Sequence, residues 1–157
     1  MEDLMNKRSL LTLGLLTFLC AGYTIASDRT DSALHGTWTL DAEKSFDYGV
    51  TNKLFGEDPT EEQLKQTRSV YIDQVSGSKI IYEEGKWKST VGKSGESEGT
   101  WMVKSKDGDK WIIEIQEKGK DLVEDFTYEW VSVTEFKITY ETNVVFYKKS
   151  NPSLESV

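Results

Sequence analysis

Cysteine and histidine are almost absent from the sequence, which contains Cys20 and His35 as the sole examples of each. Metal sites, Ser-His-Asp triads and Cys-His pairs need several such residues within reach of one another. His35 falls on the outward face of a predicted strand, and Cys20 precedes a predicted cleavage point. We therefore predict that the protein is not an enzyme, holds no metal ion and uses no cofactor.

Positive charge is also scarce, since 19 lysines and arginines face 27 acidic residues and the net charge is -8 at pH 7. Affinity for nucleic acid comes from clustered Lys and Arg, so we expect no nucleic-acid partner. The acidic side chains fall mostly at outward or turn positions, where solvated charge is the default. A hydrolase built on a pair of carboxylates stays open as a minor alternative.

Only one long apolar run is present, at residues 10–19, between the pair Lys7 and Arg8 and the small-residue segment AGYTIAS. It is shorter than the roughly 20 residues of a membrane-spanning helix and is typical of a secretory signal peptide. We predict that residues 1–26 are removed after Ala26, leaving an exported, periplasmic or secreted chain without a membrane span. An uncleaved anchor is a minor alternative. Lipid attachment at Cys20 is disfavoured because Leu19 before it is not small.

From residue 34 onward, apolar residues alternate with polar ones at the period of two that is typical of half-buried strands. Glycines in the intervening turns, of which Asp107-Gly108 is the strongest example, favour hairpins. Together these patterns predict an all-β fold, an antiparallel up-and-down barrel of about 8 strands over residues 34–150. Flexible segments are expected at residues 27–33 and 151–157, and a monomer is assumed. The predicted strands lie at residues 34–40, 69–75, 79–83, 86–91, 100–105, 111–115, 126–130, 136–140 and 145–147.

The connection over residues 41–68 is longer than a hairpin turn. Asp58 reads as the N-cap of a short helix, with Pro59 at its first position, Glu61 completing a capping box and an end near Thr67. Residues 46–55 are too apolar for a solvated linker. We expect this segment to cover one end of the barrel, either as a plug or as a lid.

The motif Gly-Thr-Trp occurs twice, in GTWTL from residue 36 and in GTWMV from residue 99. Gly36 and Gly99 would let the barrel wall bend or let a neighbouring backbone approach closely. Trp38 and Trp101, two residues later, would lie on the inward face as packing units. All four residues are predicted to be structural.

The leader, the GxW strand, the long capping loop, the hairpins and the aromatic last strand VVFYKK together resemble the small exported lipocalin-like proteins of bacteria. The resemblance implies a barrel that carries a small apolar molecule. In core lipocalins the tryptophan closes the base of the barrel beneath an arginine near the end of the last strand. This sequence has Lys148 and Lys149 there and lacks the Thr-Asp-Tyr signature, so it is similar to the looser lipocalin-like group.

Two functions follow from these expectations. The first is binding of a small apolar ligand in the barrel, which is wide enough for one such molecule. The second is a protein-interaction or inhibitor module of the cell envelope, with a filled barrel and a binding loop at residues 92–99. The predicted ligand-binding residues, from the barrel interior and the covering segment, are Tyr82, Trp87, Trp111, Phe126, Tyr128, Trp130, Tyr140, Phe46 and Phe55.

Overall fold

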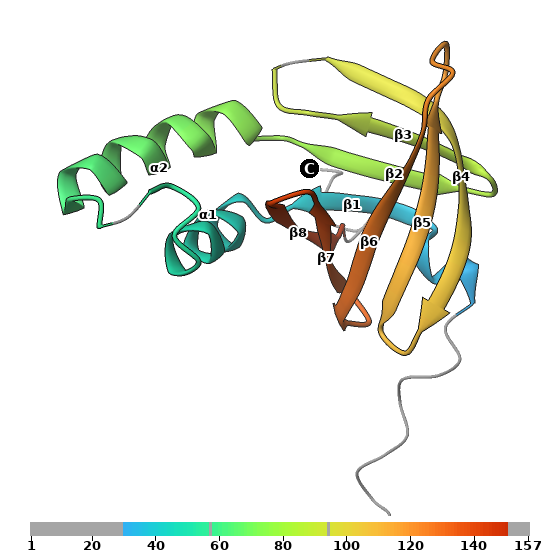
Figure 1. Ribbon diagram of the computed structural model, residues 1–157. Helices are drawn as coiled ribbons and strands as arrows, with labels where there is room; N and C mark the ends of the chain where they lie inside the picture. The colour runs from blue at the N-terminus through green and yellow to red at the C-terminus, as the bar shows by residue number, and fades with distance from the viewer. Residues whose placement is uncertain (1–29, 57, 94, 151–157) are drawn as a thin grey trace, which may run out of the picture.

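The computed structural model of the protein describes residues 30–56, 58–93 and 95–150. Within them, eight strands form a closed barrel, in which each strand pairs with the next and the last pairs back with the first (Figure 1). All of these pairings are antiparallel. The predicted up-and-down barrel is therefore confirmed. The strands are β1 (Gly36–Leu40), β2 (Lys79–Glu83), β3 (Lys86–Thr90), β4 (Glu96–Asp107), β5 (Lys110–Glu117), β6 (Val123–Ser132), β7 (Glu135–Tyr140) and β8 (Asn143–Lys149).

The period of two explains which side chains face inward. On β5, Trp111 and Ile113 are buried in the barrel while Ile112 between them is only half-buried. On β8, Val145 and Tyr147 face inward, and Phe146 points outward. Phe146 is nevertheless buried, because a helix packs on the outside of this strand.

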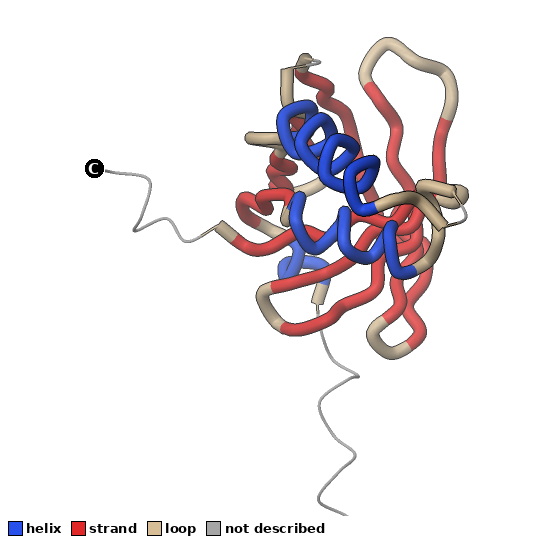
Figure 2. Tube along the Cα trace, turned by 90° about the vertical axis from the view of Figure 1, so that its left-hand side faces the viewer, coloured by secondary structure: helices blue, strands red, loops and turns tan. Residues whose placement is uncertain are grey.

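Two helices connect β1 to β2, namely α1 (Ala42–Thr51) and α2 (Glu61–Val75). They lie side by side, outside the barrel and near one of its ends (Figures 1 and 2). Helix α1 packs against β8, where the Phe146 N–H donates to Ser45 Oγ at 2.9 Å and the Tyr48 ring lies 5.6 Å from the Phe146 ring. Helix α1 is thus tied to the last strand of the barrel.

The helical region differs from the sequence prediction in three ways. Helix α2 begins after Thr60, which is its N-cap and forms a capping box with Gln63. Asp58 lies in a bend with a φ of 52°, which is not the extended conformation of an N-cap. Residues 69–75 continue α2 and do not form a strand, since neither glycine nor proline interrupts the helix before Gly77. Helix α1 was not expected as a helix. Its N-cap is Asp41, which accepts a hydrogen bond from the Lys44 N–H at 3.1 Å.

One end of the barrel is closed by its own side chains. The short 3-10 helix η1 (Asp31–Leu34) inserts the fully buried Leu34 there, although residues 31–33 were expected to be flexible and Leu34 to begin the first strand. The Trp38 indole N–H donates to the Leu34 carbonyl at 2.7 Å, and its ring lies 4.5 Å from that of Phe136. Aromatic residues fill the rest of this half, which we call the closed end. The turns β2–β3, β4–β5 and β6–β7 lie at this end.

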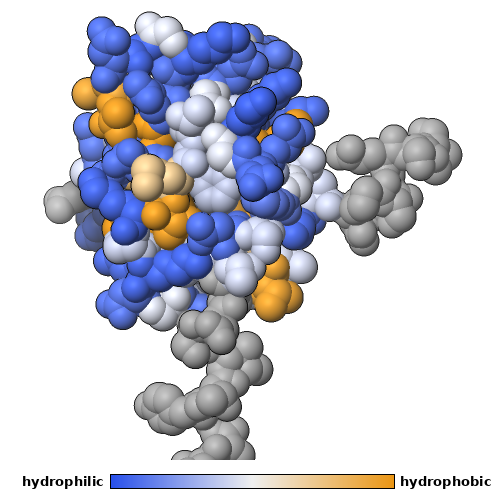
Figure 3. All heavy atoms as spheres, turned by 90° about the vertical axis from the view of Figure 1, so that its right-hand side faces the viewer, coloured by the Kyte–Doolittle hydropathy of each residue, from blue (hydrophilic) through white to orange (hydrophobic). Residues whose placement is uncertain are grey.

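The outer surface is polar over most of the side opposite the helices, with small separate apolar spots (Figure 3). Ion pairs such as Lys104–Asp125, at 2.6 Å, join strands on the outside, here β4 to β6 across β5. None of the helices in the described part of the chain has the length and apolar character required to cross a membrane.

Candidate functional site: a cavity at the open end of the barrel

The half of the barrel opposite η1 contains a cavity of about 360 Å³. It opens between the connections β3–β4, β5–β6 and β7–β8, and we call this the open end. Aliphatic side chains from four strands line its walls together with aromatic ones. The aliphatic residues are Ile80, Ile115, Ile138 and Val145.

Three tyrosines form the floor of the cavity, where it meets the packed closed end. Tyr82 and Tyr128 are each 1% exposed and their hydroxyls share a hydrogen bond, while Tyr147 is 7% exposed. Beneath them the Tyr82 ring contacts Trp101 and the Tyr128 ring contacts Phe136, at 5.3 and 5.1 Å between centroids. We call Tyr82, Tyr128 and Tyr147 the tyrosine floor.

The tyrosine floor is polar but uncharged. Burial raises the pKa of Tyr82, Tyr128 and Tyr147 above the usual value of 10, because an apolar interior disfavours the phenolate. All three hydroxyls therefore keep their protons at neutral pH. A hydroxyl of this kind is both a donor and an acceptor of hydrogen bonds.

A further polar group stands beside the floor. Trp87 on β3 is the register partner of Tyr82 on β2, lines the cavity and is 8% exposed. Its indole N–H is buried and makes no hydrogen bond to any group in the described residues. Buried N–H groups without a hydrogen-bond partner are rare. Each one loses its hydrogen bonds to water on folding and forms none in the protein, which destabilises the folded state.

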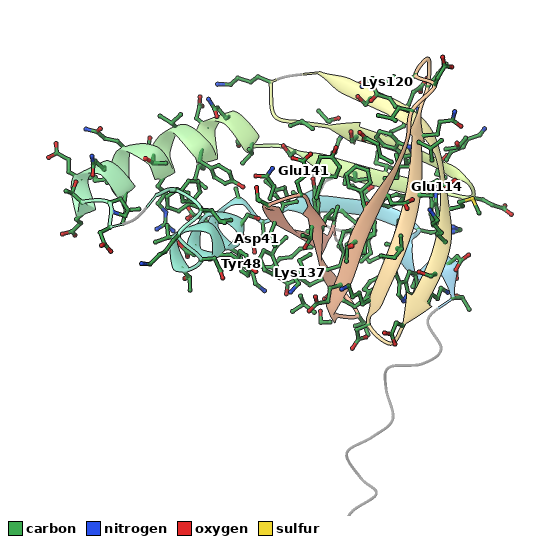
Figure 4. The ribbon with its side chains drawn as sticks, in the orientation of Figure 1. Asp41, Tyr48, Glu114, Lys120, Lys137 and Glu141 are labelled. Atoms are coloured by element: carbon green, nitrogen blue, oxygen red, sulfur yellow. The ribbon has the colours of Figure 1, made fainter. Side chains whose placement is uncertain are left out.

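Charged groups line the cavity only at its mouth. Lys120 pairs with Glu117 at 2.6 Å, and this bond lowers the pKa of Glu117. The Tyr140 hydroxyl donates to Glu124 Oε1 at 3.3 Å, and the Glu124 charge raises the pKa of Tyr140. Figure 4 shows Lys120 beside the β5–β6 turn and Glu141 at the β7–β8 turn.

The mouth also exposes apolar surface. Val91 and Leu122, from two different connections, are 48% and 63% exposed and both line the cavity. The Phe126 ring stacks on the Tyr140 ring at 4.8 Å, and Tyr140 is itself exposed. An apolar molecule would therefore meet apolar side chains both at the entrance and on the walls.

The structure separates the predicted ligand-binding residues into three groups. Tyr82, Trp87, Phe126, Tyr128 and Tyr140 line the cavity. Trp111 and Trp130 also point inward, but their rings pack against each other at 5.3 Å in the closed end. Phe46 and Phe55 lie outside the barrel, stacked at 4.9 Å between the helices with Tyr71, and they do not line the cavity.

The sequence prediction of ligand-binding residues left out Tyr147, Ile138 and Val145, all of which line the cavity. The period of two on strands 136–140 and 145–147 is the sequence signal that places them on one face. The segment at residues 92–99, predicted to be a loop, is partly strand, because β4 begins at Glu96.

The two Gly-Thr-Trp motifs place their tryptophans inward but use their glycines differently. Gly36 has a φ of 118°, which L side chains rarely adopt, whereas a Cβ on Gly99 would lie 2.0 Å from the Gln116 carbonyl oxygen. The Trp101 indole N–H donates to the carbonyls of Glu83 and Lys86 at 2.8 and 3.0 Å, which holds the β2–β3 turn.

A second hollow, of about 530 Å³, lies on the outer surface across β2 to β5. Four of its charged side chains form two pairs, Lys118 with Glu98 at 2.5 Å and Lys120 with Glu117 at 2.6 Å. It is less enclosed than the barrel cavity, and most of its lining residues are charged or polar. No group of three or more acidic, histidine or cysteine side chains in the described residues is placed to hold a metal ion.

Comparison with known proteins gives one similar structure and no matching family model or curated protein. Among solved structures, the chain is similar to a DUF4847 family protein from Bacteroides vulgatus, with 13% sequence identity and a TM-score of 0.47. The similarity covers 75% of this chain and 96% of that one.

Proposed function

We propose that the protein binds and carries a small apolar molecule in the barrel cavity, and that it is a binding protein and not an enzyme. The observation that carries this proposal is the cavity itself, with its apolar walls, uncharged floor and apolar mouth. At roughly 30 Å³ for each water-sized group, its volume of about 360 Å³ corresponds to about 12 non-hydrogen atoms. This is the size of a medium-length aliphatic chain or a small ring compound.

The arrangement at the closed end supports a lipocalin-like assignment, which is part of the same proposal. Trp38 packs at the base of the barrel, and Lys149 Nζ, from the end of the last strand, lies 5.2 Å from the centroid of its ring. A cation over an indole ring is attracted by the negative face of the ring. Lys149 would thus take the position that an arginine occupies in core lipocalins.

We further propose that the protein acts outside the cytoplasm, after removal of a signal peptide. The support is the sequence pattern of residues 1–26, which lie outside the described residues. Intact-mass measurement on protein recovered from outside the cytoplasm should give a chain that begins near Ser27. A chain that retains Cys20, or one whose mass is increased by acylation, would contradict this proposal.

Binding is tested with methyl octyl ketone and decanol, two uncharged molecules close in size to the cavity. Either should raise the melting temperature of the protein, because a ligand that binds only the folded state stabilises it. Tryptophan fluorescence should change as well, since Trp87 lines the cavity. If neither compound shifts the melting temperature, and native mass spectrometry finds no molecule co-purified from the host, the carrier proposal fails and the interaction module takes its place.

Two neighbouring valines on β8 offer a matched control for this test. Val145 lines the cavity, whereas Val144 lies on the opposite face of the strand, and both are half-buried. Val145→Phe should fill part of the cavity and abolish the shift in melting temperature. Val144→Phe should leave the shift in place. Equal shifts in the two variants would show that the compounds bind elsewhere.

A further inference from the structure

The tyrosine floor offers hydrogen-bond donors that the protein itself does not use. The Tyr82 and Tyr128 hydroxyls share one hydrogen bond, and only one proton can lie between two oxygens. The hydroxyl that accepts this bond therefore has a proton left to donate. The indole N–H of Trp87, the register partner of Tyr82, is also buried and has no partner in the described part of the chain.

The floor lacks any charge that could balance an anion. The charged residues that line the cavity are Glu117, Lys120 and Glu124, which belong to the β5–β6 end at the mouth. Lys120 is already paired with Glu117. An ionised carboxylate at the floor would lose its hydration without gaining a cation, which is costly in an apolar interior.

Resting on the proposed function, we infer that the ligand carries an uncharged hydrogen-bond acceptor, such as a ketone or ester carbonyl, and that this end lies deep in the cavity against the Tyr82–Tyr128 pair. The apolar remainder of the ligand lies along the aliphatic walls and reaches the mouth between Val91 and Leu122. A free carboxylic acid of the same length would have to leave its ionised group at the mouth.

The test compares methyl octyl ketone with decanoate at neutral pH, by calorimetric titration of the wild-type protein and of Tyr→Phe variants. Each single variant, Tyr82→Phe or Tyr128→Phe, keeps one hydroxyl of the Tyr82–Tyr128 pair with a free proton, so ketone affinity should fall by less than about threefold. The double variant removes both hydroxyls of the pair and should lose about three- to tenfold, the value of one neutral hydrogen bond. Tyr48→Phe, on helix α1 outside the barrel, is the matched control and should leave the affinity unchanged.

Infrared spectroscopy measures a property of the bound ketone that a purely structural effect of the Tyr→Phe substitutions would not change. The carbonyl stretch of the bound ketone should lie at lower frequency in the wild-type protein than in the double variant, because a donated hydrogen bond weakens the C=O bond. Melting curves of the unliganded variants show whether each one is folded at the titration temperature. Decanoate should bind the wild-type protein more weakly than the ketone, and the double variant should not change its affinity.

The possible failures are distinguishable. If the ketone binds but neither its affinity nor its carbonyl frequency depends on the two tyrosines, the inferred orientation is wrong and the carrier function stands. Decanoate that binds as tightly as the ketone, and that also loses affinity in the double variant, would overturn the preference for an uncharged group. If neither the ketone nor decanoate binds the wild-type protein, this inference fails; the proposed function fails with it when decanol also gives no shift in melting temperature and no molecule co-purifies from the host.

Discussion

The hydroxyl groups of Tyr82 on β2 and Tyr128 on β6 meet in a hydrogen bond across the inside of the barrel. These strands are not neighbours in the sheet, so the bond joins opposite walls. The two rings are nearly perpendicular, at 78°, with centroids 6.3 Å apart.

Removal of either hydroxyl should destabilise the fold modestly. We expect Tyr82→Phe and Tyr128→Phe each to lower the free energy of unfolding by about 1 kcal/mol, because the remaining buried hydroxyl loses its partner. The double variant should cost less than the sum of the two, by about 0.5 kcal/mol or more. Denaturant unfolding measures all three. Strictly additive losses would mean that the two hydroxyls do not interact in solution.

Trp38 should be far more important for stability than its neighbour His35. Trp38 is fully buried and donates to the Leu34 carbonyl, so Trp38→Ala should lower the free energy of unfolding by about 3 to 5 kcal/mol. His35 is half-buried and touches Trp101 edge to face, at 6.0 Å. His35→Ala should cost less than about 1 kcal/mol. Equal losses in denaturant unfolding would contradict the packing described for the closed end.

Gly99 is expected to tolerate no side chain. A Cβ there would overlap the backbone carbonyl of Gln116, which cannot move without disturbing β5, so Gly99→Ala should cost about 3 kcal/mol. Gly108→Ala is the control, since its φ of 56° carries strain of about 1 kcal/mol but no atom lies within 4 Å of the added methyl group. Thermal melts of the two variants should rank them in this order, and the reverse order would rule out the close contact.

Asp41 should stabilise the fold in a pH-dependent way. Burial favours its neutral form, but the Lys148 ammonium at 2.5 Å and the Lys44 N–H outweigh burial and lower the pKa of Asp41 below 3.8. A lowered folded-state pKa gives stability that is present above about pH 4 and is lost as the pH falls through the folded-state value. Asp41→Asn keeps the cap acceptor and removes the charge.

We therefore expect Asp41→Asn to be about 1 kcal/mol less stable than the wild-type protein at pH 7. The difference should shrink toward zero as the solution is acidified below pH 4. Unfolding curves at several pH values measure it. A constant difference across this range would show that the charge of Asp41 is not involved.

The tyrosine floor should make the protein less stable at high pH, whereas the loss of the Asp41 charge makes it less stable at low pH. The pKa values of its three phenols are raised by burial above 10, so the stability they contribute is present below about pH 10 and is lost as the pH rises toward the folded-state values. Phenolate absorbance should therefore appear for these residues only together with unfolding. A replacement of all three by phenylalanine should make the loss of stability above pH 10 shallower. Ionisation of these residues in a protein that stays folded would contradict their burial.

The barrel was predictable from the sequence because side chains of a strand alternate strictly between two faces. The same rule could not separate the cavity from the closed end. Trp111 and Ile115 lie on the same face of β5, yet the first is packed at the base and the second lines the cavity. The alternation along a strand decides whether a side chain points into or out of the barrel. Its position along the barrel axis depends instead on strand register and tilt.

The helices were predicted less well because several capping signals compete in one short stretch. Asp58-Pro59-Thr60-Glu61 contains two possible N-caps, and the backbone selects Thr60, which is in the extended region that an N-cap needs. Asp41 caps α1, with Glu43 in the first turn, whereas the apolar residues that follow were expected to form a cover for the barrel. Tyr48 instead packs against Phe146 on the outer face of β8, whereas Phe46 and Phe55 pack against Tyr71 of α2. No local pattern reveals either contact.

The pairing of β1 with β8, together with the docking of α1 on β8, has a consequence for the order of folding. Strand β1 and helix α1 leave the ribosome early, but both need residues 143–149 as partners. The hairpins from β2 to β8 can form from contacts that are local in the sequence, whereas closure must bring together the two ends of the domain. Contacts of such long sequence separation are slow to form. Barrel closure is therefore expected to limit the rate of folding, and the edges of β1 and β8 stay unpaired until it occurs.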